Sequence, residues 1–116
     1  MTPASCLFCR IVAGEAPSTI VHSDDLVVAF RDIAPRAPTH ILVVPRRHFA
    51  SVLALGPDEG LLLARIFTVA ADLARQEGIA ERGFRVVANS GAWAGQSVDH
   101  LHFHLLGGRP FGWPPG

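Results

Sequence analysis

The stretch Asp99-His100-Leu101-His102-Phe103-His104-Leu105-Leu106 alternates histidine with large apolar residues. Alternation with a period of two is typical of a β-strand that has one buried face, so we predict a strand over residues 99–106. In such a strand the three histidines lie on one face, and the apolar residues between them point into a core. A single histidine is commonly a hydrogen-bonded polar residue, whereas three on one face indicate a chemical site.

Four more strands are predicted from short runs of β-branched and apolar residues, at positions 19–22, 26–31, 40–44 and 84–89. The third run is continuously apolar and stops at Pro45, which fits a buried central strand. Ser23-Asp24-Asp25 is predicted to form a hairpin turn, and the proline-rich segment 34–38 to form a stiff loop.

One long helix is predicted over residues 57–76, where large apolar residues recur at helical spacing and Gly78 supplies a stop. Residues 6–13 begin a short helix that Gly14 and Pro17 break. These elements predict an α+β fold, an antiparallel sheet of about five strands with one long helix and a short N-terminal one. The length of 116 residues suits a single domain over residues 1–116.

The composition limits the classes of partner. Ten basic residues balance ten acidic ones, so no overall charge favours nucleic acid. No apolar run reaches the roughly 18 residues that a membrane span needs. The chain begins without a basic segment followed by an apolar one, so we expect a cytoplasmic protein.

Two functions suit the three histidines, namely metal binding and covalent catalysis. At about 3.3 Å per residue, the Cα atoms of His100 and His104 in a straight strand are roughly 13 Å apart, so their rings barely reach a common point. Two of the three histidines could share a metal ion with ligands from elsewhere, whereas all three on an unbent strand could not. A neutral imidazole is a good nucleophile near pH 7, and the central His102 would have donors for phosphoryl oxygens on either side. The upstream Gly95-Gln96-Ser97 offers backbone N–H groups, an amide and a hydroxyl for a phosphate.

The segment Gly95-Gln96-Ser97-Val98-Asp99-His100-Leu101-His102-Phe103-His104-Leu105-Leu106-Gly107-Gly108-Arg109 resembles the signature of the histidine triad (HIT) family. More narrowly, it is similar to the Hint branch of nucleoside phosphoramidate hydrolases, also called protein-kinase-C-interacting-protein-like. The resemblance includes Ala29-Phe30-Arg31-Asp32-Ile33, Ala37-Pro38-Thr39-His40 and the end Trp113-Pro114-Pro115-Gly116, and so covers nearly the whole chain.

The resemblance implies a homodimer with one continuous sheet and a purine nucleotide in each subunit. His102 would attack the α-phosphorus to give a nucleotidyl-histidine, which water hydrolyses without a catalytic cofactor. His100, His104 and His40 would position it, contact the phosphate and move protons. The alternative is a nucleotide sensor or scaffold whose turnover is incidental.

The resemblance also assigns nucleotide-binding positions. Asp32 would accept hydrogen bonds from the ribose, and Trp113 in the C-terminal tail would help form the partner's leaving-group pocket. Apolar positions would surround the base: Phe8, Ile11, Phe30, Ile33 and Leu42. Polar positions would lie near the phosphate: Asn89, Gly95, Gln96 and Ser97.

Three positions depart from the family pattern. Ala94 replaces a common glycine, Trp93 is large and apolar in a loop that is usually polar, and Asp99 replaces a common aromatic residue. A glycine at position 94 would matter most if the backbone there needs a positive φ.

Cys6-Leu7-Phe8-Cys9 has the spacing of a metal-binding pair. Similarity to bacterial relatives that carry a metal suggests a structural Cys₂His₂ zinc site completed by His48 and His100. The alternative is a pair of buried free thiols.

Overall fold

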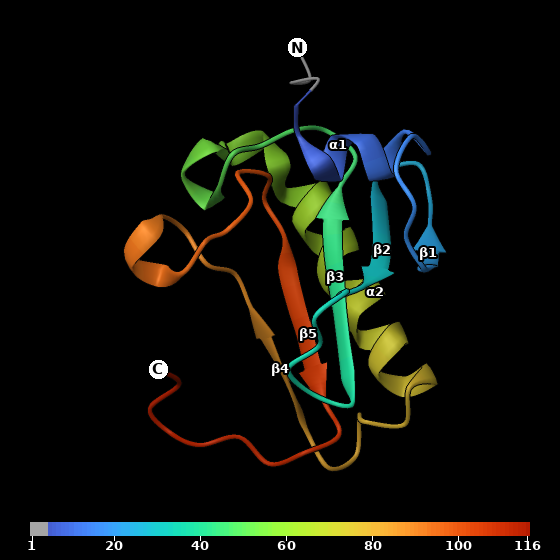
Figure 1. The fold of residues 1–116 in the computed structure, drawn as a ribbon, viewed down its shortest axis with the longest axis vertical. Coiled ribbons are helices and arrows are strands. Elements are labelled where there is room, and N and C mark those ends of the chain that lie inside the picture. The colour runs from blue at the N-terminus through green and yellow to red at the C-terminus, as the bar shows by residue number, and fades with distance from the viewer. Residues whose placement is uncertain (1–4) are drawn as a thin grey trace.

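The computed structural model describes residues 5–116 and confirms the predicted α+β fold (Figure 1). Its sheet is antiparallel throughout, with strand order β1-β2-β3-β5-β4. The strands are β1 (Ile20–Ser23), β2 (Val27–Arg31), β3 (Thr39–Pro45), β4 (Phe84–Val87) and β5 (Phe103–Gly107). The helices are α1 (Leu7–Val12) and α2 (Gly60–Gln76), with short 3₁₀ turns η1 (Val52–Ala54), η2 (Pro57–Glu59) and η3 (Ala92–Ala94).

The central strand β3 separates two apolar cores. Ile41 and Val43 belong to the larger core, which also includes Ile66 of α2. Leu42 and Val44 belong to a smaller core that contains Phe8 and Ile11 of α1 and Val28 and Phe30 of β2. Every residue of β3 is buried, as its apolar run predicts. The long helix runs behind the sheet in Figure 1, and α1 lies near the upper ends of β2 and β3.

The strand predicted over 99–106 is the main correction, because β5 begins only at Phe103. Its register with β3 pairs Val43 with Phe103, so Val44 and His102 would be opposite each other next, and Pro45 and Leu101 would be the next pair to exchange backbone hydrogen bonds. The backbone N–H of Arg46 donates to Leu26, so the neighbouring nitrogen of Pro45 faces β5 without a hydrogen to donate. The β3–β5 ladder therefore stops, and the N–H of Leu101 bonds instead to the carbonyl of Phe49 at 2.6 Å.

The other predicted boundaries are close to the observed ones. The first turn of the predicted long helix is the 3₁₀ turn η2, and α2 continues from Gly60. Strand β4 ends at Val87, which pairs with His104, rather than at position 89. In the part of the chain described, no helix is both long and apolar enough to span a membrane.

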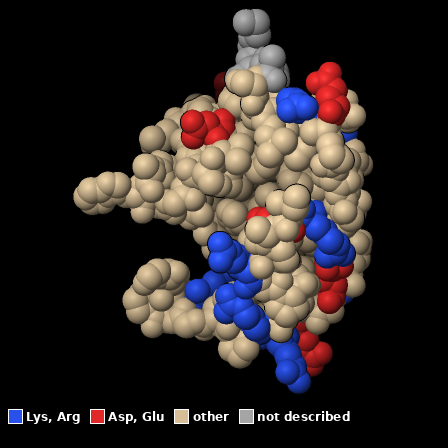
Figure 2. Space-filling view, viewed as in Figure 1, with Lys and Arg blue, Asp and Glu red and all other residues tan. Residues whose placement is uncertain are grey.

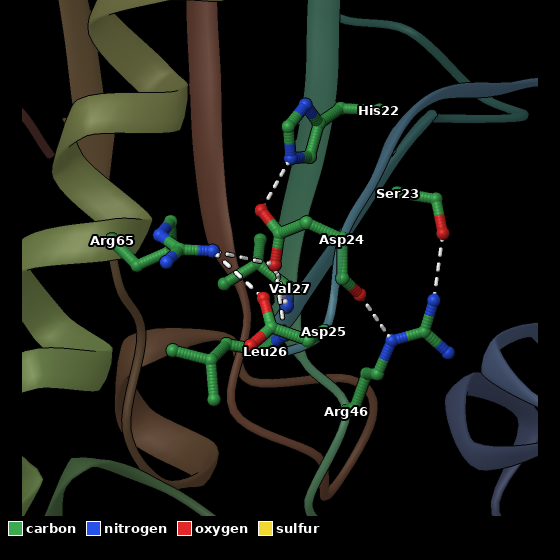
Figure 3. Close-up of polar contacts among 8 residues, drawn as sticks. All are labelled: His22, Ser23, Asp24, Asp25, Leu26, Val27, Arg46 and Arg65. Carbon is green, nitrogen blue, oxygen red and sulfur yellow. Dashed lines mark hydrogen bonds and ion pairs between the residues drawn. The ribbon is translucent and has the colours of Figure 1, made fainter.

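The predicted turn at Ser23-Asp24-Asp25 is held by the carboxylate of Asp24 (Figure 3). One oxygen accepts hydrogen bonds from the backbone N–H groups of Leu26 and Val27 at 2.7 and 2.9 Å. The other lies 2.6 Å from Nε2 of His22. Arg65 of α2 reaches Asp24 at 3.1 Å, which ties the hairpin to the long helix. These contacts lower the pKa of Asp24 despite its partial burial, which acts in the opposite direction.

Candidate functional site

The ring of His102 is held in one tautomer by the backbone. It lies in the bent segment before β5, and its Nδ1 is 2.7 Å from the backbone carbonyl oxygen of His100. A carbonyl oxygen only accepts, so Nδ1 carries the hydrogen and the neutral ring keeps its lone pair on Nε2. The edge-to-face contact with Phe8, at 5.0 Å between ring centroids, holds the ring from the side of α1. His102 therefore has the arrangement of a nucleophile that attacks through Nε2.

Two further histidines, His40 and His104, lie beside His102. The backbone N–H of Arg36 donates to Nδ1 of His40 at 3.0 Å, so a neutral His40 carries its hydrogen on Nε2. That Nε2 lies 2.9 Å from Nδ1 of His104 and 3.4 Å from a carboxylate oxygen of Asp32. When His104 accepts this bond, its own hydrogen is on Nε2. The ring centroids of His102 and His104 are 4.9 Å apart, so this donor lies next to the predicted nucleophile.

Burial keeps these two rings neutral. The pKa of His104 is lowered to about 4, first by burial and then by the neighbouring His102 and His40. The pKa of His40 is lowered by burial and by Arg36, while Asp32 opposes this shift. At neutral pH both rings are therefore uncharged hydrogen-bond donors, which agrees with the tautomers deduced from their contacts.

The ring of His100 does not lie with those of His102, His104 and His40. This corrects the prediction of three histidine rings on one strand face. The His100 ring is fully buried and turned toward the cysteines. Nε2 lies 2.9 Å from the carbonyl oxygen of Pro45 and must donate to it, which leaves a lone pair on Nδ1. Nδ1 is 3.4 Å from the sulfur atoms of both Cys6 and Cys9 and 3.2 Å from Nδ1 of His48.

These four side chains fit a metal ion. Their ligand atoms, two sulfurs and two imidazole nitrogens, lie within 4.8 Å of one another. Cys₂His₂ is a common ligand set of structural zinc, and the bond from His100 to Pro45 is the kind that orients a metal-binding histidine. Burial, together with the neighbouring Cys6, raises the pKa of Cys9 to about 11, so this thiol needs a cation to become a thiolate.

A second group, Asp32 with His40 and His104, is equally close. Here the ring nitrogens of His40 already have hydrogen-bond partners. Nδ1 accepts from the backbone N–H of Arg36, and Nε2 donates to His104. Hydrogen bonds therefore account for these ring-nitrogen contacts without an ion.

The predicted base-contacting residues divide into two groups. Four of them are buried in the smaller core, next to the histidines: Phe8, Ile11, Phe30 and Leu42. In contrast, Ile33 is fully exposed in the loop after β2. Asp32 begins the same loop and accepts a hydrogen bond from the backbone N–H of Ala34 at 2.8 Å. Trp113 is exposed in the C-terminal tail.

The loop of residues 90–98 is built around Gln96. Its side-chain amide donates to the carbonyl of Ala50 at 2.7 Å and accepts from the backbone N–H of Gly91 at 2.9 Å, so it holds the loop together. Gly91 and Gly95 have φ values of 86° and 85°, which glycine adopts at no steric cost. No other residue type in the described chain has a positive φ, so the alanine at position 94 does not strain this loop. Ser97 is exposed and Asn89 is half-buried.

Two contacts were not anticipated from the sequence. Asp32 approaches His40 as well as being the predicted ribose ligand, and Phe8 packs on the predicted nucleophile. The first follows from the β2–β3 register, which brings both ends of this loop together: the N–H of Asp32 donates to the carbonyl of His40 at 3.0 Å. A predicted hairpin over these strands contains this signal, whereas nothing local places Phe8.

Comparisons with known proteins agree with this geometry. A family model described as "HIT domain" matches residues 13–111. Purine nucleoside phosphoramidase from Escherichia coli (strain K12) is 51% identical over 106 residues, which cover 91% of this chain and 89% of that protein. Adenylylsulfatase HINT1 from Arabidopsis thaliana is 46% identical over 112 residues, covering 95% of this chain and 76% of the other.

Solved structures are also similar. The HIT family hydrolase from Legionella pneumophila Philadelphia 1 has a TM-score of 0.94 at 49% identity, covering 97% of this chain and 100% of that one. A HIT family hydrolase from Clostridium thermocellum has a TM-score of 0.93 at 44% identity, with 96% of each chain covered.

Proposed function

The chain belongs to the HIT domain family, and on that basis we propose that it is a hydrolase that cleaves the P–N bond of purine nucleoside phosphoramidates. The observation that carries this proposal is the hydrogen bond from Nδ1 of His102 to the carbonyl of His100, which leaves Nε2 free to attack. The 51% identity to a purine nucleoside phosphoramidase supports the substrate class.

The reaction takes two steps. Nε2 of His102 forms a bond to the α-phosphorus, the P–N bond breaks, and the leaving nitrogen takes a proton from the histidine cluster, which consists of His40 and His104. Water then attacks the same phosphorus, the bond to Nε2 breaks, and the proton lost by the water restores the cluster. The path through His104, His40 and Asp32 suits this exchange, because its members already share hydrogen-bond distances beside the nucleophile.

We propose the predicted nucleotide contacts as part of this site. The carboxylate of Asp32 would bind the ribose, and the apolar side chains around α1 would contact the base. The backbone of Gly95, Gln96 and Ser97, with Asn89, would lie near the phosphate. Backbone N–H groups are the better donors here, since the amide of Gln96 is occupied within its own loop.

We further propose a homodimer in which the sheet continues across β4. This strand is at one edge of the sheet, and an exposed edge offers unpaired backbone groups to a second copy. The tail follows the same side of the molecule, where Arg85 of β4 donates to the carbonyl of Gly112. Trp113 in that tail has 84% of its surface exposed, and burial against a partner would contribute roughly 1.5–3 kcal/mol.

The C-terminal tail packs against two arginines, Arg85 of β4 and Arg109. Figure 2 shows basic side chains in the lower part of the molecule, beside the C-terminal segment that protrudes at the lower left. All of the basic residues are arginines. Phe111 contacts the guanidinium groups of Arg85 and Arg109 at 5.3 and 4.3 Å from its ring centroid. Arg109 in turn donates to the carbonyl of Arg36, whose N–H contacts His40. These contacts attach the start of the tail to its own subunit, and we propose that the exposed Trp113 further along contributes to the leaving-group pocket of the partner.

Zinc is the metal we propose for the cluster of Cys6, Cys9, His48 and His100, in a structural role. When bound, the ion would join α1 to the end of β3 and to the segment before β5, and catalysis needs no further cofactor. Unpaired cysteines fit a reducing compartment, in keeping with a cytoplasmic protein.

Turnover of a panel of adenosine 5′-phosphoramidates tests this function, with alkaline quenching to trap the nucleotidyl-protein, because the P–N bond to histidine is stable in alkali and labile in acid. We expect product release with every P–N substrate and labelled protein in the quenched samples. Tight binding of adenosine monophosphate without any turnover would instead support the sensor or scaffold function.

A further inference from the structure

The backbone and the ring of His100 serve two different places. The ring nitrogen Nδ1 belongs to the cysteine cluster, at 3.4 Å from each sulfur. The carbonyl oxygen of the same residue accepts the hydrogen bond that sets the tautomer of His102, at 2.7 Å. The two contacts are separated by only a few covalent bonds, so a movement of the backbone at His100 disturbs both.

The short helix α1 forms a second connection between the cluster and the nucleophile. Its six residues are too few for a helix that is stable by itself, so its position depends on what it is attached to. Cys6 caps the helix and Cys9 lies in it, so two of the four potential ligands belong to this element. Phe8, between them in sequence, packs edge-on against the rings of His100 and His102 at 6.0 and 5.0 Å.

We propose that a metal ion held by Cys6, Cys9, His48 and His100 positions the nucleophile, by fixing the carbonyl of His100 and the ring of Phe8 on two sides of His102. The metal site then positions His102 for catalysis and also fixes the N-terminal segment to the sheet. This inference rests on the proposed function for its kinetic consequence, whereas its structural consequence is independent of any turnover.

Access to the cluster is compatible with exchange of the ion. An open depression of about 400 Å³ is lined by Cys6 and His48, together with Ser5, Leu7, Ser97, Val98 and Asp99. Removal by a chelator and reloading are therefore practical on the folded protein.

The test compares metal-loaded protein, chelator-treated protein and the Cys6→Ser variant, all labelled with ¹⁵N histidine. Long-range ¹H–¹⁵N spectra report which ring nitrogen of His102 carries hydrogen, with the His102→Gln variant used for assignment. Single-turnover kinetics at saturating adenosine phosphoramidate measure the formation of the nucleotidyl-histidine, so that altered nucleotide affinity does not enter.

We expect loaded protein to contain one ion per chain and a single Nδ1–H tautomer of His102. Chelator-treated and Cys6→Ser proteins should show both tautomers of His102 and a single-turnover rate at least tenfold lower. Added zinc or cobalt should restore the single tautomer and the rate in the chelator-treated protein but not in Cys6→Ser. A protein without phosphoramidase activity would give no kinetic signal in any form, yet the tautomer change would still support the coupling.

The matched control is Ile66→Ala, which opens the core on the opposite side of the sheet without touching the cluster. It should lower Tm while the tautomer and the single-turnover rate stay as in the loaded wild type. The proposal is overturned if chelation lowers Tm but leaves the His102 spectrum unchanged, if Ile66→Ala causes the same spectral change, or if the purified protein binds no metal.

Discussion

Nε2 of His40 lies 2.9 Å from Nδ1 of His104, although 64 positions separate them in the chain. The β3–β5 register places His40 opposite Leu106 and His104 opposite Leu42, so the two histidines are diagonal neighbours on one face of the sheet. The backbone N–H of Arg36 then sets the direction of the bond, because it occupies the other ring nitrogen of His40. The proposed proton path beside His102 is thus built on the register of the sheet.

The first prediction tests this path. His40→Ala should lower kcat by about 10²-fold or more, the usual contribution of a group that moves protons, because His104 loses its hydrogen-bond donor. His22→Ala is the matched control, since His22 contacts Asp24 in the β1–β2 turn and should leave kcat near the wild-type value. Equal rates for wild type and His40→Ala would remove His40 from the mechanism.

The second prediction concerns the nucleophile. His102→Ala should abolish phosphoramidate turnover and the trapped covalent intermediate, because no other described ring presents a free Nε2 lone pair in this place. Adenosine monophosphate should still bind, as measured by calorimetry, since the proposed ribose and base contacts remain. Residual turnover at the wild-type rate would exclude covalent catalysis by this residue.

The third prediction concerns recognition of the sugar. Asp32→Ala should weaken the binding of a ribonucleotide by about 1–3 kcal/mol, the cost of losing hydrogen bonds to a charged group. The 2′-deoxynucleotide should lose less, because one of the two hydroxyl groups is already absent. If calorimetry gives equal losses for the two ligands, Asp32 does not bind the ribose.

The fourth prediction concerns stability and pH. The pKa of His104 is about 4 in the folded protein and near 6.5 in an unfolded chain, because burial disfavours the charged ring. Between these values the unfolded state binds more protons, so the free energy of unfolding should fall as the pH is lowered through this range. Burial lowers the pKa of His40 and of His100 as well, which acts in the same direction.

Urea unfolding at several pH values measures this dependence. His104→Gln, which cannot take up a proton, should have a shallower slope between pH 4 and 6.5 than the wild type. A slope that is the same in both proteins would show that His104 does not titrate as its burial implies.

The fifth prediction concerns the C-terminal tail. Deletion of residues 111–116 should change the ratio of kcat/KM between a phosphoramidate with a bulky amine and the unsubstituted one. The affinity for adenosine monophosphate and the dimer should largely persist, because the proposed nucleotide contacts and β4 remain. An unchanged ratio would mean that the tail only packs against Arg85 and Arg109.

Local patterns in the sequence determine most of the elements. The apolar run of β3, the alternation of Phe103 and Leu105, and the helical spacing within α2 each correspond to a buried face in the structure. The reason is that these patterns depend on the geometry of a single element, so each can be recognised without knowing its neighbours. The chemical importance of the alternating histidines is also visible at this level.

Tertiary structure decides which partner each histidine has. The missing N–H of Pro45 ends the β3–β5 ladder and lets His100 turn to the cysteines, while His104 stays in β5 and meets His40. An alternating pattern contains no information about where a neighbouring strand stops offering hydrogen bonds, so it predicts one row of three rings. The separation of the cysteine–histidine cluster from the pair His40 and His104 therefore arises from strand register and from one proline 55 residues before His100.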